Sequence, residues 1–307
     1  MKKIFIDGSA GTTGLKIVSR LSVRSDIQLI ALPEEYRKDT SARADALNSA
    51  DIAFLCLPDS AAIEAVSLVT NENTAIIDTS TAHRVDDTWA YGFAELKGYR
   101  HKIQNSKRIA NPGCHASGFV ALVRPLVENG IIPTDLALTS HSLTGYSGGG
   151  KKMIADYTSP MRSQLLDAPA QYAVSQNHKH LKEMVKICGI TTTPIFTPIV
   201  APYYSGMEVT VPLFAKDING KIQDIEDVYR EYYQDGLVHF VPNHDNSAFL
   251  YANSMSGRDD MQLTVCGNDD RILLIARFDN LGKGASGAAI QNMNILMGIH
   301  ESTGLVL

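Results

Sequence analysis

Cys114 is the residue whose type and position most favour covalent chemistry. It follows the strand-like run KRIA through Asn111-Pro112-Gly113 and precedes an apolar helix predicted over Cys114–Glu128. The start of a helix lowers the pKa of a thiol and presents unpaired N–H groups that steady an oxyanion. A cysteine beside proline and glycine is more often structural, so the residues alone leave a nucleophile and a structural thiol both open.

A second candidate for chemistry is the group of His178, His180 and Glu183, just before a predicted helix. Reactions of a thiol need a proton carrier that works near neutral pH, and histidine is the usual choice. Spacing does not choose between His178 and His180, and Glu183 is suited to orient one of them. A solvated helix cap is the alternative. No metal site is expected, because no cysteine or further histidine lies near in the sequence.

A glycine-rich turn follows the first strand-like run and opens the first predicted helix. Its GxxGxxG spacing permits a tight turn and close approach of the backbone, and the following helix offers N–H groups to a pyrophosphate. A turn without a ligand is the alternative. We expect a bound dinucleotide, and its candidate contacts are Gly8, Ser9, Ala10, Gly11, Thr12, Thr13 and Gly14, with Pro58 after the third strand-like run.

Two cations, Arg37 and Lys38, follow the second strand-like run. An acidic residue in this region binds the ribose of NAD, whereas cations accommodate the 2′-phosphate of NADP. Glu34 and Glu35 oppose this assignment, and an ordinary solvated loop fits equally well. The sequence favours NADP and leaves NAD open.

The elements that must position these residues fall into two patterns. The first 110 residues alternate short apolar runs with amphipathic helical segments, which predicts an α/β domain built on a doubly wound parallel sheet. Ligands of such sheets bind beyond the carboxyl ends of the strands. The strand-like runs are KKIFID, QLIAL, DIAFLCL, TAIID and KRIAN, and helices are predicted over 14–24 and 60–70. We place this domain at residues 1–113.

Residues 114–283 follow a different pattern and predict a separate α+β domain. Long β-rich segments indicate a mixed or antiparallel sheet with helices between its strands. The segments are LALTSHSLT, GMEVTVPLF, MQLTVCGND and RILLIARFDN, and helices are predicted around 153–165 and 222–233. A last helix within 284–307 has small and apolar residues at helical spacing, and we expect it to complete the first domain.

Composition limits the class of protein. The 307 residues carry a formal net charge of −5, and the scattered charges form no basic stripe that would neutralise a nucleic acid. The amino terminus lacks the apolar stretch of a signal peptide, and no run approaches the roughly 18 apolar residues that span a bilayer. The 4 cysteines form no CxxC pair, which favours reduced thiols. We expect a cytoplasmic protein without nucleic-acid or membrane partners.

Three regions together resemble a known family. They are NPGC at 111–114, TGYSGGGKK at 144–152, and NLGKGASG at 280–287 with QNMN at 291–294. Together they resemble the N-acetyl-γ-glutamyl-phosphate reductases, and the resemblance runs from the first glycine loop to the last helix. The family also shares the pattern HxHxxE that His178, His180 and Glu183 form, which favours them as the source of the proton carrier. The modest length and the HASG after Cys114, where longer members usually have an aromatic residue and threonine, are similar to the shorter, second type.

The resemblance implies a Rossmann domain followed by a catalytic domain of the glyceraldehyde-3-phosphate dehydrogenase type. It also implies an NADPH-dependent reaction of arginine biosynthesis, in which the small-molecule acyl phosphate N-acetylglutamyl 5-phosphate becomes N-acetylglutamate 5-semialdehyde. The Cys114 thiolate would expel phosphate and form a thioester that accepts hydride. The family further implies a homo-oligomer, a dimer or a tetramer, with the β-rich domain as the expected interface.

A substrate of this kind carries a phosphate and a carboxylate, which need cations and backbone donors. One segment of this type lies at the predicted helix start after residue 146. Another, at 78–84, matches a family segment, and a structural turn is the alternative for both. The substrate-binding candidates are Ser80, Arg84, Asn111, Ser147, Gly148, Gly149 and Lys151. Gly282 and Asn292 are expected to meet the nicotinamide end of the cofactor.

Other functions remain open at this point. Aspartate-semialdehyde dehydrogenase shares the fold, the thiol and an acyl-phosphate substrate, and a lysine-pathway homologue acts on a carrier-bound acyl phosphate. The segments GYSGGGKK and QNMN weigh against the former. An NADP-binding sensor without catalysis is a third reading, which the intact Cys114 and the HKH sequence oppose. Four further histidines and the other three cysteines are predicted to be surface or core residues: His101, His141, His239, His244, Cys56, Cys188 and Cys266.

Overall fold

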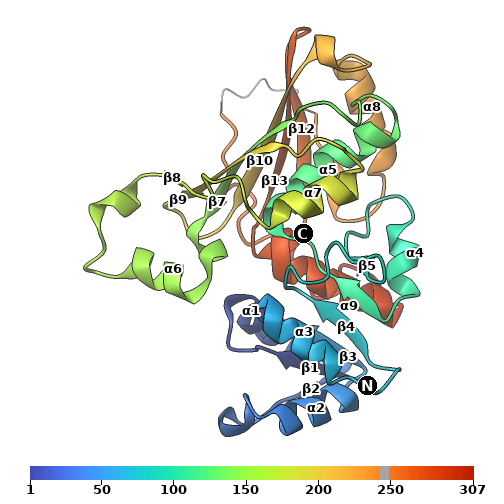
Figure 1. Ribbon diagram of the computed structural model, residues 1–307, viewed down its shortest axis with the longest axis vertical. Coiled ribbons are helices and arrows are strands. Elements are labelled where there is room, and N and C mark those ends of the chain that lie inside the picture. Colours follow the sequence, from blue (N-terminus) through green and yellow to red (C-terminus); the bar gives the residue numbers. More distant parts are fainter. Residues whose placement is uncertain (243–248) are drawn as a thin grey trace. The chain divides into compact units, whose positions relative to one another are not determined.

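A computed structural model of the chain describes residues 1–242 and 249–307, so that His244 lies outside the described residues. The chain divides into two compact units. The first unit comprises Met1–Ala94, Gly98–Pro112 and Ala285–Leu305, and the second comprises Glu95–Lys97, Gly113–Gly284 and Val306–Leu307. The N-terminal sheet and the C-terminal helix therefore belong to one unit, although nearly the whole chain separates them in sequence (Figure 1).

The first unit is built on a six-stranded sheet in which all paired strands are parallel. The strand order is β2-β1-β3-β4-β6-β5. The chain leaves β1 toward one edge and returns to its other side at β3, and ligands of open α/β sheets bind at such a reversal. The strands are β1 Lys2–Asp7, β2 Ile27–Ile30, β3 Ile52–Leu55, β4 Ala75–Asp78, β5 Ala90–Tyr91 and β6 Arg108–Ala110.

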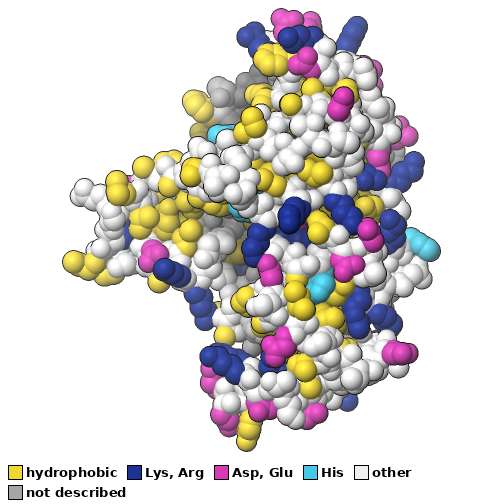
Figure 2. All heavy atoms as spheres, viewed as in Figure 1, with side chains coloured by type: hydrophobic (Ala, Val, Ile, Leu, Met, Phe, Trp, Pro, Cys, Tyr) yellow, Lys and Arg dark blue, Asp and Glu magenta, His cyan; other side chains and the backbone are white. Residues whose placement is uncertain are grey.

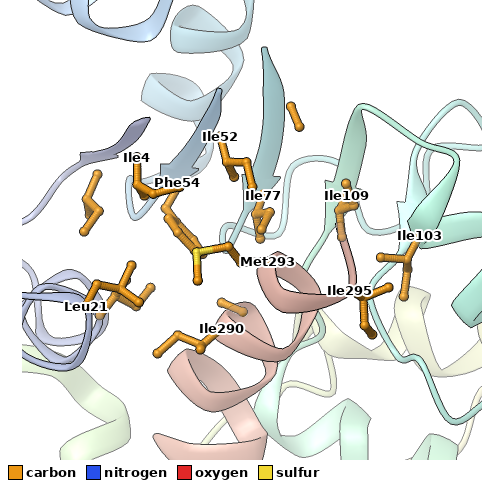
Figure 3. Packing of buried hydrophobic residues seen from close by; sticks show 14 of the residues in the cluster. Ile4, Leu21, Ile52, Phe54, Ile77, Ile103, Ile109, Ile290, Met293 and Ile295 are labelled. Carbon is orange, nitrogen blue, oxygen red and sulfur yellow. The ribbon is translucent and has the colours of Figure 1, made fainter. Parts of the chain in front are cut away.

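Helices cover both faces of this sheet, because its central strands are buried on both sides. On one face, Ile290 and Met293 of α9 pack with Phe54 and Ile77 of the strands (Figure 3). On the other face, helices α2 and α3 contribute Leu47 and several alanines to a second cluster. The helices of the unit are α1 Thr12–Leu21, α2 Thr40–Ser49, α3 Asp59–Ser67, α4 Tyr99–Gln104 and α9 Gly287–Met297.

The second unit contains a seven-stranded mixed sheet in the order β11-β12-β13-β10-β7-β9-β8. Its central strands β12, β13, β10 and β7 are antiparallel, whereas β7 and β9 run parallel. The strands are β7 Thr139–Gly145, β8 Ala170–Gln171, β9 Ile195–Ala201, β10 Met207–Phe214, β11 Val238–Phe240, β12 Met261–Gly267 and β13 Arg271–Phe278.

Helix α5 is the central helix of this unit and packs closely on the sheet. A Cβ added at its Gly118 would come within 2.5 Å of Val209 on β10, so the contact requires glycine. Hydroxyl groups of Tyr229 and Tyr233 in and after α8 donate to carbonyls of α5. The helices are α5 Cys114–Glu128, α6 Gly150–Thr158, α7 His180–Cys188 and α8 Ile222–Tyr232 (Figure 1).

The predicted fold class, a doubly wound α/β sheet with a second α+β part, is confirmed. Several elements differ from the expectation, among them α2 and α6. Helix α2 was not predicted, because its sequence TSARADALNS lacks apolar periodicity, although Asp39 caps its first turn by accepting from the Ala42 N–H at 2.8 Å. The helix expected over 153–165 begins and ends earlier, since Pro160 disfavours helical backbone at Ser159.

None of the helices in the described residues is long and apolar enough to span a membrane.

Candidate active site

Cys114 is the first residue of α5 and is half-exposed. The residue before the helix, Gly113, makes no side-chain cap. The first turn of α5 therefore keeps backbone N–H groups beside the thiol that can bind an oxyanion. Gly284 approaches from the NLGKGASG segment, where an added Cβ would lie 3.0 Å from the Cβ of Cys114. The absence of a side chain at Gly284 leaves room for the cysteine.

Glu183 fixes the loop that presents Cys114. Its Oε1 accepts a hydrogen bond of 2.8 Å from the backbone N–H of Gly113, and its side chain is only 1% exposed. A bond to a charged, buried acceptor of this kind contributes about 1.5 to 3 kcal/mol. From sequence, Glu183 was expected to orient a histidine, and its bond to the cysteine loop was missed.

His178 and His180 lie near the start of α5. The ring centroids of His178 and His180 lie 5.8 and 5.7 Å from that of His115, the residue after Cys114. His180 is buried as the first residue of α7, and its backbone N–H donates to Nδ1 of His178 at 3.2 Å. The neutral form of His178 then carries its proton on Nε2.

His115 was not identified from the sequence, yet it is central to this cluster. Its Nδ1 lies 2.7 Å from Oγ of Ser142, and its Nε2 lies 2.6 Å from the hydroxyl of Tyr172. Burial, followed by the charge of His178, lowers the pKa of His115 to about 3, so the ring is neutral. Its place next to Cys114 was the only signal available in the sequence.

Tyr172 connects this cluster to the thiol electrostatically. Burial raises the pKa of its phenol well above the ordinary range, and the charge of Cys114 raises it further. The phenol is therefore protonated near neutral pH and acts as a hydrogen-bond donor.

Two of the motif segments meet in the second unit. Asn280 donates from Nδ2 to Oγ of the buried Ser147 at 3.0 Å and accepts at Oδ1 from the N–H of Gly206. Gly148 lies beside the same amide, and helix α6 begins directly after Gly149 without a side-chain cap. Lys151, in the first turn of α6, is exposed.

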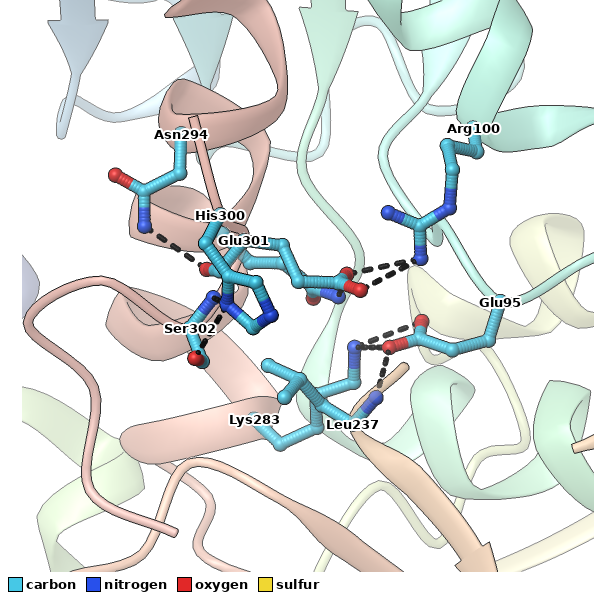
Figure 4. Close-up of polar contacts among 9 residues, drawn as sticks. Glu95, Arg100, Leu237, Lys283, Asn294, His300, Glu301 and Ser302 are labelled. Atoms are coloured by element: carbon cyan, nitrogen blue, oxygen red, sulfur yellow. Dashed lines mark hydrogen bonds and ion pairs between the residues drawn. The ribbon is translucent and has the colours of Figure 1, made fainter. Parts of the chain in front are cut away.

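Close packing requires glycine at position 282, the third residue of NLGKGASG. A Cβ at Gly282 would lie 1.9 Å from the carbonyl oxygen of Arg258. The next residue, Lys283, is buried and donates to both carboxylate oxygens of Glu95 at 2.7 and 2.8 Å (Figure 4). Glu95 also accepts from the N–H of Leu237. Replacing either member of such a buried pair leaves an uncompensated charge.

The glycine loop of the first unit has the geometry of an anion-binding turn. Gly8 has a φ of +82°, and an added Cβ would lie 2.3 Å from the Cys56 carbonyl oxygen at the end of β3. A Cβ at Gly14 would lie 2.5 Å from the Gly8 carbonyl oxygen. Gly11 precedes α1 without a side-chain cap, and Oγ1 of Thr12 is buried with no partner among the described residues.

A cavity of about 300 Å³ lies beside this loop. Gly8, Ser9 and Ala10 line it together with Glu34 and Arg37, which form an ion pair of 3.0 Å. Lys38 is exposed and does not line the cavity. Pro58 is the residue before α3 and is exposed after the end of β3. Thr13 lies in the first turn of α1.

Ser80, Arg84, Asn111 and Asn292 gather around the carboxyl ends of β4 and β6. Ser80 donates to the buried carboxylate of Asp78 at 2.7 Å. Arg84 donates to the backbone carbonyls of Thr79 and Asn111, both at 2.9 Å. Nδ2 of Asn292 donates to the carbonyl of Gly92 and to Oδ1 of Asn111, whereas its Oδ1 is buried with no partner among the described residues.

Metal ligands do not cluster in the part of the chain that the structure describes: no group of three or more His, Cys, Asp or Glu is placed to hold an ion.

Comparison with known proteins agrees with this geometry. Residues 114–280 match the family model of the semialdehyde dehydrogenase dimerisation domain, and residues 32–106 match that of the semialdehyde dehydrogenase NAD-binding domain. The chain is 45% identical to N-acetyl-gamma-glutamyl-phosphate reductase 2 of Nostoc sp. over 318 aligned residues, with 99% of each chain covered. It is 46% identical to the N-acetyl-gamma-glutamyl-phosphate reductase of Brucella ovis, with 96% of this chain and 99% of the relative covered.

The chain belongs to the N-acetyl-gamma-glutamyl-phosphate reductase family. Solved structures of more distant proteins share its fold. Aspartate semialdehyde dehydrogenase II of Vibrio cholerae is 17% identical, with a TM-score of 0.73 over 97% of this chain and 99% of that chain. The NADP complex of aspartate semialdehyde dehydrogenase from Candida albicans is also 17% identical, with a TM-score of 0.69 over 97% of this chain and 98% of that chain.

The structure brings together residues of this reductase-family chain that the sequence motifs did not connect. Ser142 lies on β7, Tyr172 directly follows β8, and Asn280 lies in the segment after β13. Their positions in the sequence are far apart, and no spacing rule connects them. Strand register and helix packing bring them to the start of α5 and to Ser147.

Proposed function

We propose that this chain reduces N-acetyl-L-glutamyl 5-phosphate with NADPH to N-acetyl-L-glutamate 5-semialdehyde and phosphate, a reaction of arginine biosynthesis. The observation that carries the proposal is Cys114 at the uncapped start of α5, with its loop held by Glu183, in a chain of this reductase family. A thiol in this position is suited to attack an acyl phosphate.

The thiolate of Cys114 attacks the acyl carbon, the carbon–oxygen bond to phosphate breaks, and a thioester forms. N–H groups at the start of α5 stabilise the oxyanion of this step. The nicotinamide cofactor supplies the hydride that reduces the thioester. The thiohemiacetal oxyanion then collapses, releases the aldehyde and leaves the sulfur as a thiolate, and one proton taken up from solvent restores the thiol before the next turnover.

His180 is the proton carrier in this proposal. The Nδ1 lone pair of His178 accepts the backbone N–H of His180, which makes His178 the poorer base. His180 takes the thiol proton and gives it to the departing phosphate. His178 supports the ring of His180, whose centroid lies 4.6 Å away, and Glu183 positions the loop of Cys114.

The residues of the first unit fit a dinucleotide. The chain contains a match to an NAD-binding domain, and Gly8 and Gly14 leave space that a Cβ would fill. The buried oxygens of Thr12 and Asn292 lack partners among the described residues, which suits a phosphate contact and a carboxamide contact. We assign NADP over NAD because Arg37 lines the cavity beside the loop, where its pairing with Glu34 is exposed and weak.

The substrate anions are assigned to two groups of residues. Ser80, Arg84 and Asn111 belong to the first unit, where Arg84 is held by backbone carbonyls. Ser147, Gly148, Gly149 and Lys151 belong to the second unit, at the uncapped start of α6. Exposed Lys151 supplies a cation near helix N–H groups, a combination suited to a phosphate or a carboxylate.

The first compact unit corresponds in this proposal to the cofactor-binding domain at residues 1–113, completed by the helix within 284–307. The second corresponds to the catalytic and oligomerisation domain at 114–283, which matches a dimerisation domain. We assign the protein to the cytoplasm, since all four cysteines are thiols rather than disulfides.

The proposed homo-oligomer, a dimer or a tetramer, uses the outward face of the mixed sheet. Pro212, Leu273 and Ile195 lie on one face by strand register, and Ile195 is 61% exposed. Phe214, at the end of β10, is 57% exposed. Hydrophobic side chains also gather over the segment that carries α6 and β8, where Met161, Leu165 and Val174 are exposed (Figure 2).

The reaction is tested in the reverse direction with purified protein. N-acetylglutamate 5-semialdehyde should reduce NADP only when phosphate is added, and Cys114→Ser should lower the rate by at least about 10³-fold, because the nucleophile is lost. Cys266→Ser, which alters another half-exposed thiol, is the matched control and should keep the rate.

Other outcomes assign other functions. Faster turnover of aspartate semialdehyde than of N-acetylglutamate semialdehyde would replace the substrate assignment. Tight binding of NADP without turnover of either aldehyde would favour a cofactor-binding sensor.

A further inference from the structure

His115, Ser142 and Tyr172 form a buried chain of hydrogen bonds next to the nucleophile. Ser142 lies on β7, Tyr172 directly follows β8, and His115 is the second residue of α5. The two hydrogen bonds, of 2.7 Å to Ser142 and 2.6 Å to Tyr172, use both nitrogens of the ring. This hydrogen-bond relay, made of Ser142, His115 and Tyr172, therefore spans from the sheet to the first turn of the helix that carries Cys114.

Ser142 determines the direction in which the hydrogen bonds of this relay are donated. Its side chain is fully buried, and among the described residues its hydroxyl proton has His115 Nδ1 as its acceptor. A buried hydroxyl that donates to nothing is costly, so Ser142 donates and Nδ1 accepts. Because burial keeps the His115 ring neutral, the ring proton is on Nε2 and is donated to the Tyr172 oxygen.

Tyr172 then retains its own phenolic proton for another acceptor. Its hydroxyl lies 2.6 Å from the ring of His115, the residue that follows Cys114 in the first turn of α5. Burial, followed by the charge of Cys114, raises the pKa of the phenol, in keeping with a position near the thiol. We propose that Ser142 and His115 are positioning residues that turn the Tyr172 hydroxyl toward Cys114, where it donates to the thiolate. The inference rests on the proposed thiol chemistry and adds a device that holds the thiolate ready.

Other titratable groups face the same helix start. His178 and His180 come from the start of α7, and Glu183 comes from its first turn. Their ionisation contributes to any pH profile measured on Cys114. The test therefore compares variants of the relay that leave all three residues in place.

The experiment measures the rate at which iodoacetamide alkylates Cys114 between pH 5 and pH 9, followed by mass spectrometry of the Cys114 peptide from the full chain. Loss of one hydrogen bond to a charged acceptor should raise the apparent pKa of alkylation by about 1 unit in Tyr172→Phe and in His115→Phe. The double variant should show no larger shift than either single variant. The amide of the introduced glutamine in His115→Gln can still donate to Tyr172. The shift in His115→Gln should therefore be no more than half of the shift in His115→Phe.

Ser140 provides a matched control for Ser142. Both serines are fully buried on β7, but Oγ of Ser140 has no partner among the described residues. Ser142→Ala should shift the profile in the same direction as His115→Phe, whereas Ser140→Ala should leave it unchanged. Circular dichroism of each variant checks that it is folded.

An unchanged alkylation profile in folded His115→Phe would overturn the relay, as would a shift in His115→Gln as large as that in His115→Phe, or additive shifts in the double variant. Equal shifts in Ser142→Ala and Ser140→Ala would do the same, because they would reflect packing alone. Alkylation requires no substrate. A shifted profile in a protein that does not turn over N-acetylglutamate 5-semialdehyde would therefore support the relay and contradict the proposed function.

Discussion

At the scale of single residues, charge and burial oppose each other next to the nucleophile. His115 is 3% exposed and sits among aromatic rings of Tyr172, His178 and Phe196. Desolvation makes the protonated ring unfavourable, so the ring of His115 is neutral in the folded chain. The same burial that suits His115 to transmit a hydrogen bond makes the fold sensitive to acid.

The acid sensitivity can be measured as a difference between wild type and His115→Phe. The pKa of His115 is about 3 in the folded chain, below the ordinary value of 6.5. Below pH 6.5 the unfolded chain therefore binds a proton that the folded chain does not bind, and the free energy of unfolding decreases as the pH falls. Between pH 6.5 and pH 5, urea unfolding of the wild type should lose about 2 kcal/mol more than the variant. Equal losses in both proteins would contradict a buried neutral His115.

At the scale of elements, each unit presents the start of a helix without a side-chain cap. In the first unit, α1 follows a glycine turn that packs against the end of β3, and in the second, α5 follows the loop held by Glu183. Asp7, the last residue of β1, is fixed by the buried Arg43 of α2 at 3.0 Å. Strand ends and neighbouring helices thus determine the conformation of both loops.

Gly8 and Gly98 separate the two reasons for glycine. Both have a positive φ, of +82° and +81°, but a Cβ at Gly8 meets the Cys56 carbonyl, whereas a Cβ at Gly98 meets nothing within 4 Å. Gly98→Ala should cost about 1 to 2 kcal/mol of stability and leave NADPH affinity unchanged. Gly8→Ala should also displace the loop and weaken NADPH binding at least about tenfold. Titration by fluorescence measures both, and equal affinities would refute the steric role of Gly8.

At the scale of the whole molecule, the outward face of the mixed sheet carries both buried polar atoms and exposed apolar side chains. Glu208 and Arg277 are directly paired across β10 and β13 on the outward face. Oε2 of Glu208, Nε of Arg277 and the hydroxyl of Tyr203 are buried with no partner among the described residues. Burial raises the pKa of Glu208 although Arg277 opposes the shift. These atoms are already closed to solvent within one chain, so the proposed interface consists of the exposed apolar side chains of this face, such as Phe214 and Ile195.

Phe214→Asp should therefore lower the oligomeric mass measured by light scattering, because it places a charge on the proposed apolar interface. Val23→Asp is the matched control, since Val23 is equally apolar, is exposed and belongs to the first unit. A wild-type mass equal to that of one chain, or an unchanged mass in Phe214→Asp, would place the interface elsewhere.

The sequence by itself determined the regular elements and the local turns. Apolar runs such as KKIFID and AIID predicted the buried parallel strands, and the helix at Cys114–Glu128 has the bounds that the pattern predicted. Glycine spacing located the loop at Gly8–Gly14. The place of Cys114 before an apolar helix made it a candidate, and the family resemblance then favoured it as the nucleophile. These features follow from propensity and from steric limits that act over a few residues.

Only the tertiary structure decided which distant residues meet at these turns. It joined Glu183 to the Gly113 N–H, His115 to Ser142 and Tyr172, and Asn280 to Ser147. Contacts of this kind depend on strand register and helix packing, which arise from the whole core, so no local spacing contains them.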